Sequence, residues 1–279
     1  MALPRYFPFM HGVYDVKAGI TSLGKDFGNG ALDSQVFQLD DQFEIYHAAK
    51  QHAMSHHSQH FFWGDIADAA VIEIGEWMID RLNDEHPGSY AGKPGDCGLV
   101  GIGLLIQEDI VVLQIDQRGR NQLTHLNVAM PSGWAPEEKI GRSFDMVHAP
   151  VPHIEPINAK QHSIARLMVN ATRGAVRFAW TITDDPALNH HPKRDRSIEH
   201  PTPLPDHPVG EPLLRVERQV IWGFPEYRAS LFLIRTYLYP FNTLETEVRA
   251  ALAQAVAGMS EASLQYKNMG RALILERLA

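Results

Sequence analysis

The chain of 279 residues and 31.3 kDa is long enough for one large domain or two small ones, with a hydrophobic core that needs no disulfide or metal. It is 44% hydrophobic and 21% charged, a composition that excludes an intrinsically disordered protein. The net charge of -8 and the pI near 6.0 argue against a nucleic-acid partner, because nucleic-acid-binding domains carry a basic surface.

The N-terminal stretch MALPRYFPFMHGVYDV has neither a basic n-region nor a continuous apolar segment, so it does not predict a signal peptide. No run of apolar residues has the length of a membrane span. We therefore expect a cytoplasmic protein with no membrane partner. A single cysteine, Cys97, excludes disulfides and multi-cysteine clusters within the chain, and leaves 15 histidines as the main pool of metal ligands.

The first 95 residues predict an N-terminal arm and a helical extension. Residues 1–36 are rich in glycine and aromatic residues and have weak periodicity, which is typical of an irregular arm. Residues 41–84 show helical spacing in two blocks separated near Gly64. The turn-rich stretch HPGSYAGKPGD at 86–96 follows and closes this helical part.

After residue 96 the composition changes to that of β-strands. Five segments qualify: LVGIGLLIQEDIVVLQID, QLTHLNVAMP, VRFAWTIT, LLRVERQVIWGF and SLFLIRTYLYPF. Two helices are predicted between the second and third segments, over 136–148 and 157–173, and a hairpin at 225–229 joins the last two strands. This order predicts an α+β fold with one antiparallel sheet and helices on a single face. The loop 187–212, with six prolines, is either an ordered functional loop or a mobile lid, and helical residues 246–279 close the chain.

His148 lies in the last turn of the predicted helix 136–148, before Pro150 and Pro152. Ile140, Phe144 and His148 are spaced at i, i+4 and i+8, so the imidazole points with the apolar side chains toward the sheet. One interpretation is a core histidine bonded to a backbone carbonyl. The other is an axial ligand to a buried metal or haem.

The segment PSGWAPEEKIGRSFDMVHAPVP around this histidine resembles the signature of the haem-dependent oxidative N-demethylase family. Further stretches match in the same order: LPRYFPF, IQEDIVVL, VRFAW, LRVERQ, LFLIRTYL and YK at 266–267. The resemblance implies a PAS-like fold, a five-stranded antiparallel sheet that holds haem b against its helices. It also implies oxidation of a small methylated amine such as dimethylamine by a haem-dependent monooxygenase. Such a catalytic subunit uses dioxygen and electrons from a flavin and iron-sulfur reductase, and it releases formaldehyde.

The resemblance assigns the axial-ligand role to His148, with His153 as the second choice. Haem propionates need cationic partners, and three arginines in strand segments are candidates, although each is equally explained by a salt bridge in the sheet: Arg177, Arg218 and Arg235. An amine substrate is a cation and calls for carboxylates and aromatic rings, for which the matched blocks offer Glu108, Glu217, Trp180 and Tyr237. Core packing is an equally simple role for Trp180, and a structural ion pair is one for Glu217.

Other motifs carry less weight. His52, His56 and His60 recur every fourth residue, a spacing that can bind zinc, but they lack the glutamate of an HExxH motif. His190 and His191, in the proline-rich loop, are expected to face solvent.

Two other functions remain open at this stage. A PAS-like domain can be a haem-based gas or redox sensor, although no output domain or coiled coil follows here. The chain can also be a non-catalytic subunit of the same family. In each case we expect one compact unit, with the PAS-like haem-binding core over residues 96–245.

Overall fold

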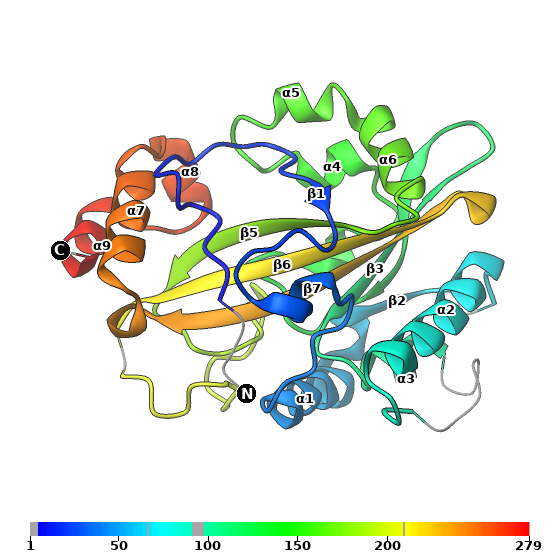
Figure 1. The fold of residues 1–279 in the computed structure, drawn as a ribbon, viewed down its shortest axis with the longest axis horizontal. Helices are drawn as coiled ribbons and strands as arrows, with labels where there is room; N and C mark the ends of the chain where they lie inside the picture. Colours follow the sequence, from blue (N-terminus) through cyan, green and yellow to red (C-terminus); the bar gives the residue numbers. More distant parts are fainter. Residues whose placement is uncertain (1–4, 66, 91–97, 209, 279) are drawn as a thin grey trace.

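A computed structural model describes residues 5–65, 67–90, 98–208 and 210–278 (Figure 1). Its centre is a sheet with the strand order β1-β5-β6-β7-β3-β4-β2, in which every neighbouring pair is antiparallel. The strands are β1 (Thr21–Ser22), β2 (Phe62–Gly64), β3 (Asp109–Ile115), β4 (Asn121–Asn127), β5 (Ala175–Thr183), β6 (Leu213–Phe224) and β7 (Ala229–Pro240). The predicted mixture of helices with one antiparallel sheet is confirmed, and two short strands extend the five expected ones.

The helices form three groups around this sheet (Figure 1). The α-helices are α1 (Phe43–Phe61), α2 (Ala69–Glu85), α3 (Gly98–Gly103), α4 (Phe144–His148), α5 (Glu155–Asn158), α6 (Gln161–Val169), α7 (Thr246–Ala257), α8 (Glu261–Tyr266) and α9 (Arg271–Leu278). The 3-10 turns are η1 (Gly30–Ser34), η2 (Pro136–Glu138), η3 (Pro225–Tyr227) and η4 (Phe241–Thr243). None of the described helices is both long and apolar enough to cross a membrane.

Helices cover both faces of the sheet, so the prediction of a single covered face is wrong. On β3, Ile110 and Val112 pack with α2 and α3, whereas Val111 and Leu113 pack with α4 and α6. Successive side chains of a strand point to opposite faces, and this strand is apolar at both sets of positions. A strand that is apolar on both faces has to be covered on both. The uninterrupted apolar run IVVL of β3 therefore indicates two covered faces.

The two longest strands form the predicted hairpin. β6 and β7 pair from Leu213↔Pro240 to Phe224↔Ala229, and η3 makes the connection. Arg228 ends that turn with φ of 49°, the left-handed conformation that lets so short a connection close. This hairpin fixes which residues of β6 and β7 share a face, and so decides which predicted site residues can meet.

Three predicted elements differ from the structure. Residues 98–103, expected to begin a strand, form helix α3, and GIG at 101–103 lies at its end. The predicted helix 136–148 is divided into η2 and α4, because Gly141 adopts φ of 72° between them. The predicted helix 157–173 is divided into α5 and α6. The helical blocks before and after Gly64 are confirmed as α1 and α2, while Cys97 lies outside the described residues.

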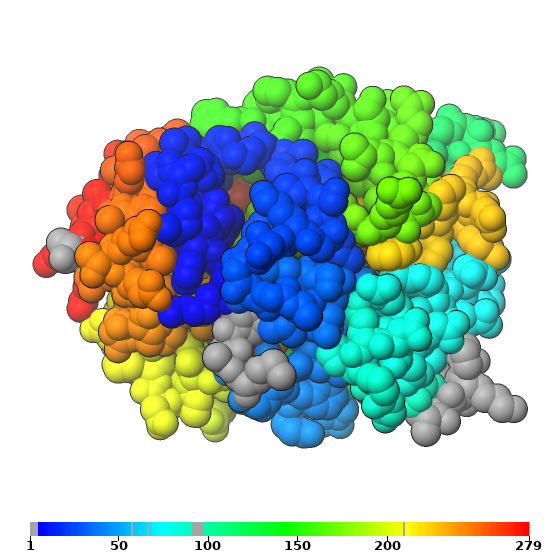
Figure 2. All heavy atoms as spheres, in the orientation of Figure 1, coloured from blue at the N-terminus to red at the C-terminus, as the bar shows by residue number. Residues whose placement is uncertain are grey.

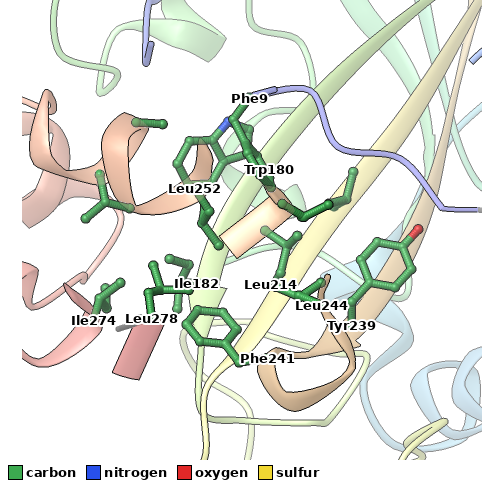
Figure 3. Close-up of a cluster of buried hydrophobic side chains, with 14 of the residues drawn as sticks. Phe9, Trp180, Ile182, Leu214, Tyr239, Phe241, Leu244, Leu252, Ile274 and Leu278 are labelled. Atoms are coloured by element: carbon green, nitrogen blue, oxygen red, sulfur yellow. The ribbon is translucent and has the colours of Figure 1, made fainter. Parts of the chain in front are cut away.

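The C-terminal helices close one end of the sheet together with the N-terminal arm (Figure 3). Phe9 of the arm packs its ring 5.3 Å from that of Trp180, and Leu252 of α7 belongs to the same buried cluster. Ile274 and Leu278 of α9 complete it. The side chain of Trp180 is therefore a core residue here, as the simpler of its two interpretations predicts.

Candidate functional site

Helix α4 carries His148 and is held in place by side chains from three other segments. The backbone N–H of Phe144 donates to Oδ1 of the buried Asn121 at 2.7 Å, which ties the start of α4 to β4. Lys139 donates to the carbonyl of Val147 at 2.8 Å, and Asn158 donates to that of Asp145 at 3.2 Å. A helix of five residues has little stability of its own, so these contacts fix the position of its last residue.

The His148 imidazole has one nitrogen committed and the other available. Nδ1 lies 2.7 Å from the carbonyl oxygen of Phe144, to which it donates its proton, and the ring stacks on Phe144 at 4.2 Å. This bond selects the tautomer with a lone pair on Nε2. Nε2 has no hydrogen-bond partner among the residues that the structure describes. Burial lowers the pKa of His148 to about 4, and the charge of Arg177 also lowers it, so the ring is neutral at physiological pH.

The sheet beneath His148 carries a chain of polar side chains from β5 and β6. Arg177 donates through Nη1 to Gln219 Oε1 at 2.8 Å, and Gln219 donates to Glu217 Oε2 at 2.7 Å. Nε of Arg177 also donates to the carbonyl of Ala18 in the arm. The register Arg177↔Gln219 and Ala179↔Glu217 places these groups on one face, toward α4 and α6. The result is a cation and a carboxylate side by side, with His148 close enough to be affected by the charge of Arg177.

Lys267 adds a second cation to this face. Its Nζ donates to the carbonyl oxygen of Trp180 at 2.7 Å. Burial lowers the pKa of Lys267 to about 8, while the charge of Glu217 raises it and that of Arg177 lowers it. Lys267 directly follows the short helix α8, far from β5 and β6 in the sequence, and its only signal there was the YK pair of the family resemblance.

This face is concave. Burial is the main cause of the lowered pKa values of Arg177 and His148, so both side chains are largely surrounded by protein. Both nevertheless keep some solvent-accessible surface. Arg177, Ala179, Thr181 and Thr183, which share this face of β5, are likewise only half-buried. Figure 2 shows a hollow in the molecular surface between the N-terminal arm and the segment that carries β1. Side chains that are enclosed and still accessible line an indentation, which is the setting of a ligand site.

Two predicted cofactor-binding arginines do not meet His148, because they point to the other face of the sheet. Arg218 pairs with Arg235 across β6 and β7, and this pair is out of phase with Arg177. Arg218 donates to the carbonyl of Gln35 at 2.6 Å. Arg235 donates to Asp40 at 2.8 Å and stacks 3.7 Å from the ring centre of Tyr46.

Glu108 and Tyr237, two of the predicted substrate-binding residues, also lie near Arg218 and Arg235, away from His148. Glu108 accepts from the backbone N–H of Gln38, and Tyr237 donates to the side chain of Gln38. Both residues are buried, with 1% of their surface exposed. The ring of Trp180 shares this face of the sheet, and the Lys267 ammonium contacts Trp180 twice, at its backbone carbonyl and 5.9 Å from the centre of its ring. Glu217 is thus the predicted substrate residue that the structure brings to the face of His148.

His153, the second choice for the axial ligand, lies at the surface. It is exposed and adopts φ of 63°, and its Nε2 lies 2.9 Å from Oγ of Ser260. Ser260 caps the start of α8 by accepting from the N–H of Ser263. The contact therefore joins the turn after α4 to the C-terminal helices.

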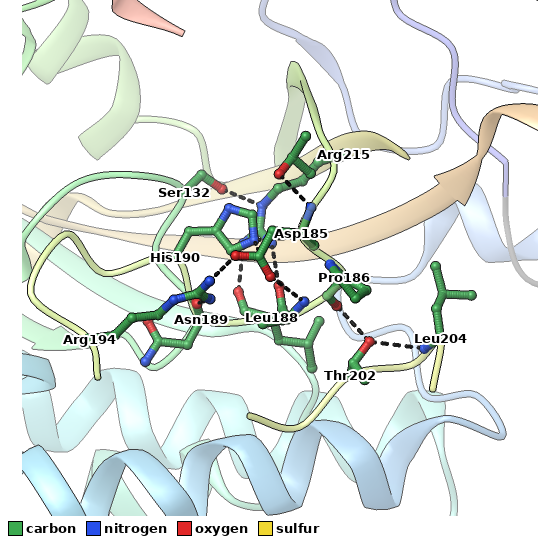
Figure 4. A network of polar contacts seen from close by, with 12 residues as sticks. Ser132, Asp185, Pro186, Leu188, Asn189, His190, Arg194, Thr202, Leu204 and Arg215 are labelled. Carbon is green, nitrogen blue, oxygen red and sulfur yellow. Dashed lines mark hydrogen bonds and ion pairs between the residues drawn. The ribbon is translucent and has the colours of Figure 1, made fainter. Parts of the chain in front are cut away.

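The proline-rich loop is ordered by the buried Arg215 of β6 (Figure 4). Arg215 Nη2 donates to the carbonyls of Met130 and Leu188, both at 2.9 Å, and Nε donates to Ser132 at 2.7 Å. Asp185, just before the loop, forms an ion pair with Arg194. These contacts tie the first part of the loop to β6 and to the segment before η2.

The expectation that His190 and His191 face solvent is wrong. His191 is 3% exposed, and burial lowers the pKa of His190 to about 2. The polar composition of the loop did not predict this burial, because residues distant in the sequence enclose the two rings: Phe61 and Glu137 lie against His191, and Arg215 lies near His190.

The chain matches a known family over most of its length. Residues 29–273 match the family described as haem-dependent oxidative N-demethylase, alpha subunit-like. The matched range contains all four groups of the concave face: His148, Arg177, Glu217 and Lys267.

Proposed function

This chain belongs to the haem-dependent oxidative N-demethylase, alpha subunit-like, family, and from that premise we propose that it is a catalytic subunit acting on a small methylated amine such as dimethylamine. One oxygen atom of dioxygen is inserted at the N-methyl C–H bond, and the resulting carbinolamine releases formaldehyde and the smaller amine. The second oxygen atom leaves as water with two electrons and two protons. A flavin and iron-sulfur reductase supplies the electrons, and the cytoplasm is the proposed location.

The observation that carries this proposal is the state of His148. An imidazole that donates Nδ1–H to a carbonyl and keeps Nε2 unprotonated has the tautomer and orientation that metal-ligating histidines show. It is rigidly held, neutral and on a concave face. These features support His148 as the residue that would ligate the iron of haem b, whereas His153 is exposed and lies against Ser260.

The charges on the same face suit the rest of the cofactor. Arg177 and Lys267 are two accessible or half-buried cations facing one carboxylate, Glu217. The excess of one positive charge favours a carboxylate such as a haem propionate, and Arg177 offers its Nη atoms for a paired bond to it. When bound, haem supplies the reduction of dioxygen and the oxidation of the methyl group.

Glu217 is the group that we assign to the amine. Gln219 occupies its Oε2, which leaves Oε1 for the N–H of an alkylammonium ion. A hydrogen bond to a carboxylate in a partly desolvated site holds a cation more strongly than one in water. The hydrogen bond from Gln219 also fixes the carboxylate plane, so the substrate nitrogen is oriented as well as attracted.

We further propose that residues 96–245 form a PAS-like haem-binding core. The support is an antiparallel sheet with five long strands, and a helical segment between the second and third of them that carries His148. On this proposal the cofactor lies between that helical segment and the sheet. Glu108, Arg218, Arg235, Tyr237 and Trp180 then stabilise the fold from the opposite face.

The test is a visible spectrum of the haem-loaded chain, combined with an assay for formaldehyde. Wild type should show a Soret band, and it should release formaldehyde from dimethylamine with dioxygen and a reductase. His148→Ala should lose both, while the matched control His153→Ala should keep both. Loss of the band in His153→Ala alone would contradict the ligand assignment.

The same measurements separate the two alternative functions. A Soret band with gas-dependent shifts, but without formaldehyde release, would identify a haem-based sensor. A featureless spectrum after haem addition would identify a non-catalytic subunit.

A further inference from the structure

Three potential metal ligands meet at a place that the proposed function does not use. They are His60 in the last turn of α1, Glu137 in η2 and His191 in the proline-rich loop, and their ligand atoms all lie within 4.8 Å of one another. His60 Nδ1 lies 3.0 Å from Glu137 Oε1, and His191 Nε2 lies 2.9 Å from Glu137 Oε2. The carboxylate is therefore held between two imidazoles from segments distant in the sequence.

The surroundings of these ligands are those of a half-enclosed site. The side chain of His191 is 2% exposed, that of Glu137 is 15% and that of His60 is 28%. Phe61 presents its ring to His191 at 5.3 Å and 71°, which shields one side. The exposed edge is on the side of His60, where a water molecule or a small ligand can approach.

We propose that His60, Glu137 and His191 bind a divalent transition ion of the zinc type. Two imidazoles and one carboxylate are a common three-residue set for such ions, with further positions left to water. The ion would join the proline-rich loop to α1 and η2. It would thereby hold these three segments together next to the residues that lead to α4. The proposal does not depend on haem or on the proposed reaction.

This site differs from the one that the sequence pattern suggested. The i, i+4 repeat places His52, His56 and His60 at a spacing that can bind zinc, although no HExxH glutamate accompanies them. In the structure His52 stacks on His56 at 4.2 Å, whereas His60 lies with Glu137 and His191. A helix stripe cannot reveal partners that come from elsewhere in the chain. His60 is the one member that the pattern and the structure share.

The ion would have to displace an existing set of hydrogen bonds. His191 Nδ1 accepts from the backbone N–H of Lys193 at 3.1 Å, so Nε2 carries the proton that is donated to Glu137. Metal binding at Nε2 moves that proton to Nδ1 and breaks the bond to Lys193. The Lys193 ammonium, 3.3 Å from Glu137 Oε1 and 59% exposed, also has to swing away. Lys193 is thus a competitor of the ion.

The experiment titrates Zn²⁺ into the full chain, freed of any histidine tag, against a chromophoric zinc chelator. We expect one equivalent bound with micromolar or tighter affinity, and a visible ligand-field spectrum with Co²⁺. His191→Ala and Glu137→Gln should each weaken binding more than about 100-fold, above the 10–100-fold effect of outer-shell groups. The matched control His56→Ala, on the same helix but outside the set, should bind as wild type. Lys193→Met should bind more tightly.

The outcomes separate a metal site from a plain hydrogen-bonded cluster. Amide exchange over residues 184–208 should slow with Zn²⁺ in wild type and not in His191→Ala. Absence of stoichiometric binding would overturn the proposal, as would equal binding by His191→Ala and wild type. Weaker binding by Lys193→Met would also overturn it, because the lysine would then support the site instead of competing for it.

Discussion

The two faces of the sheet both carry enclosed charges, and they differ in how those charges are satisfied. On the face toward α1 and α2, Lys50 donates to the carbonyls of Gly103, Ile106 and Glu108 at 2.7, 2.8 and 2.5 Å. Arg235 has Asp40 as its ion-pair partner and lies over the ring of Tyr46, although its Nε and Nη1 have no hydrogen-bond partner among the described residues. On the face toward α4, His148 Nε2 has no partner among the described residues, and Arg177 keeps accessible surface.

The comparison distinguishes charges that build the fold from charges that can bind a ligand. A buried ion pair with its hydrogen bonds made gives a rigid scaffold, and removing one partner leaves an uncompensated charge. A site needs the reverse, a polar group held firmly but with bonding capacity left over. On β6, Arg218 of the first group directly follows Glu217 of the second, so their side chains point to opposite faces of the sheet.

The largest effect is expected from Arg235→Met. It leaves the carboxylate of Asp40, whose side chain is 6% exposed, without its cation, and removes the stacking on Tyr46. We expect a loss of about 3–5 kcal/mol in the free energy of unfolding, measured with urea. Arg120→Met, which removes an exposed pair with Asp116, is the control and should unfold as wild type does. The haem spectrum of folded Arg235→Met should be unchanged, and its loss from folded protein would break the division.

The pH dependence of stability should distinguish His148 from ordinary histidines. Its pKa in the folded chain is about 4, against an ordinary value of 6.5, so the unfolded chain binds more protons between these values. Stability contributed by the neutral ring is present above pH 6.5 and is lost as pH falls toward 4, by up to about 3 kcal/mol. His125 and His190 add to the same trend.

The measurement compares urea unfolding of the haem-free wild type and His148→Gln at several pH values between 7.5 and 4. The variant should show the shallower dependence. Identical pH profiles would mean that His148 titrates normally and is not enclosed as the site requires.

Glu217→Gln should affect binding of the amine more than stability. Loss of the negative charge should weaken the affinity for dimethylammonium about 10–100-fold, the difference that a charge-assisted hydrogen bond makes. Gln at this position still accepts a bond from Gln219, so the fall in melting temperature should be smaller than in Arg235→Met. A spectral titration of the haem-loaded protein measures the affinity. An unchanged affinity would move the amine site away from Glu217.

Much of the fold was predictable from local patterns, whereas the site was predictable only in part. The segment VRFAWTIT was predicted as a strand, and alternation along a strand is enough to place Arg177 and Trp180 on opposite faces. Alternation within β5 does not show whether Arg218 of β6 lies on the same face as Arg177, because that depends on the register between the two strands. The failure at helix 136–148 has a similar cause. Apolar spacing continues through Gly141, but the chain turns there to place α4 against Asn121 of β4.

The smallest effect concerns His125 of β4, which lies on the same face as Asn127. It is 1% exposed, and neither ring nitrogen has a hydrogen-bond partner among the described residues. Burial lowers its pKa to about 4, while the charge of Asp68 raises it. Replacing an unsatisfied buried polar group by an apolar one of similar size removes a desolvation cost, so His125→Leu should raise the free energy of unfolding by about 1 kcal/mol.

Asn127→Leu is the matched control for that change, on the same strand and face. The Asn127 amide donates to the carbonyl of Leu99 at 3.0 Å, so its removal should lower stability by about 1–3 kcal/mol. Opposite signs for the two variants would show that hydrogen-bond satisfaction, and not polarity, decides what this face tolerates. A loss of stability in both would mean that the His125 ring contributes packing against Gly64, whose Cβ position would lie 2.3 Å from Nδ1.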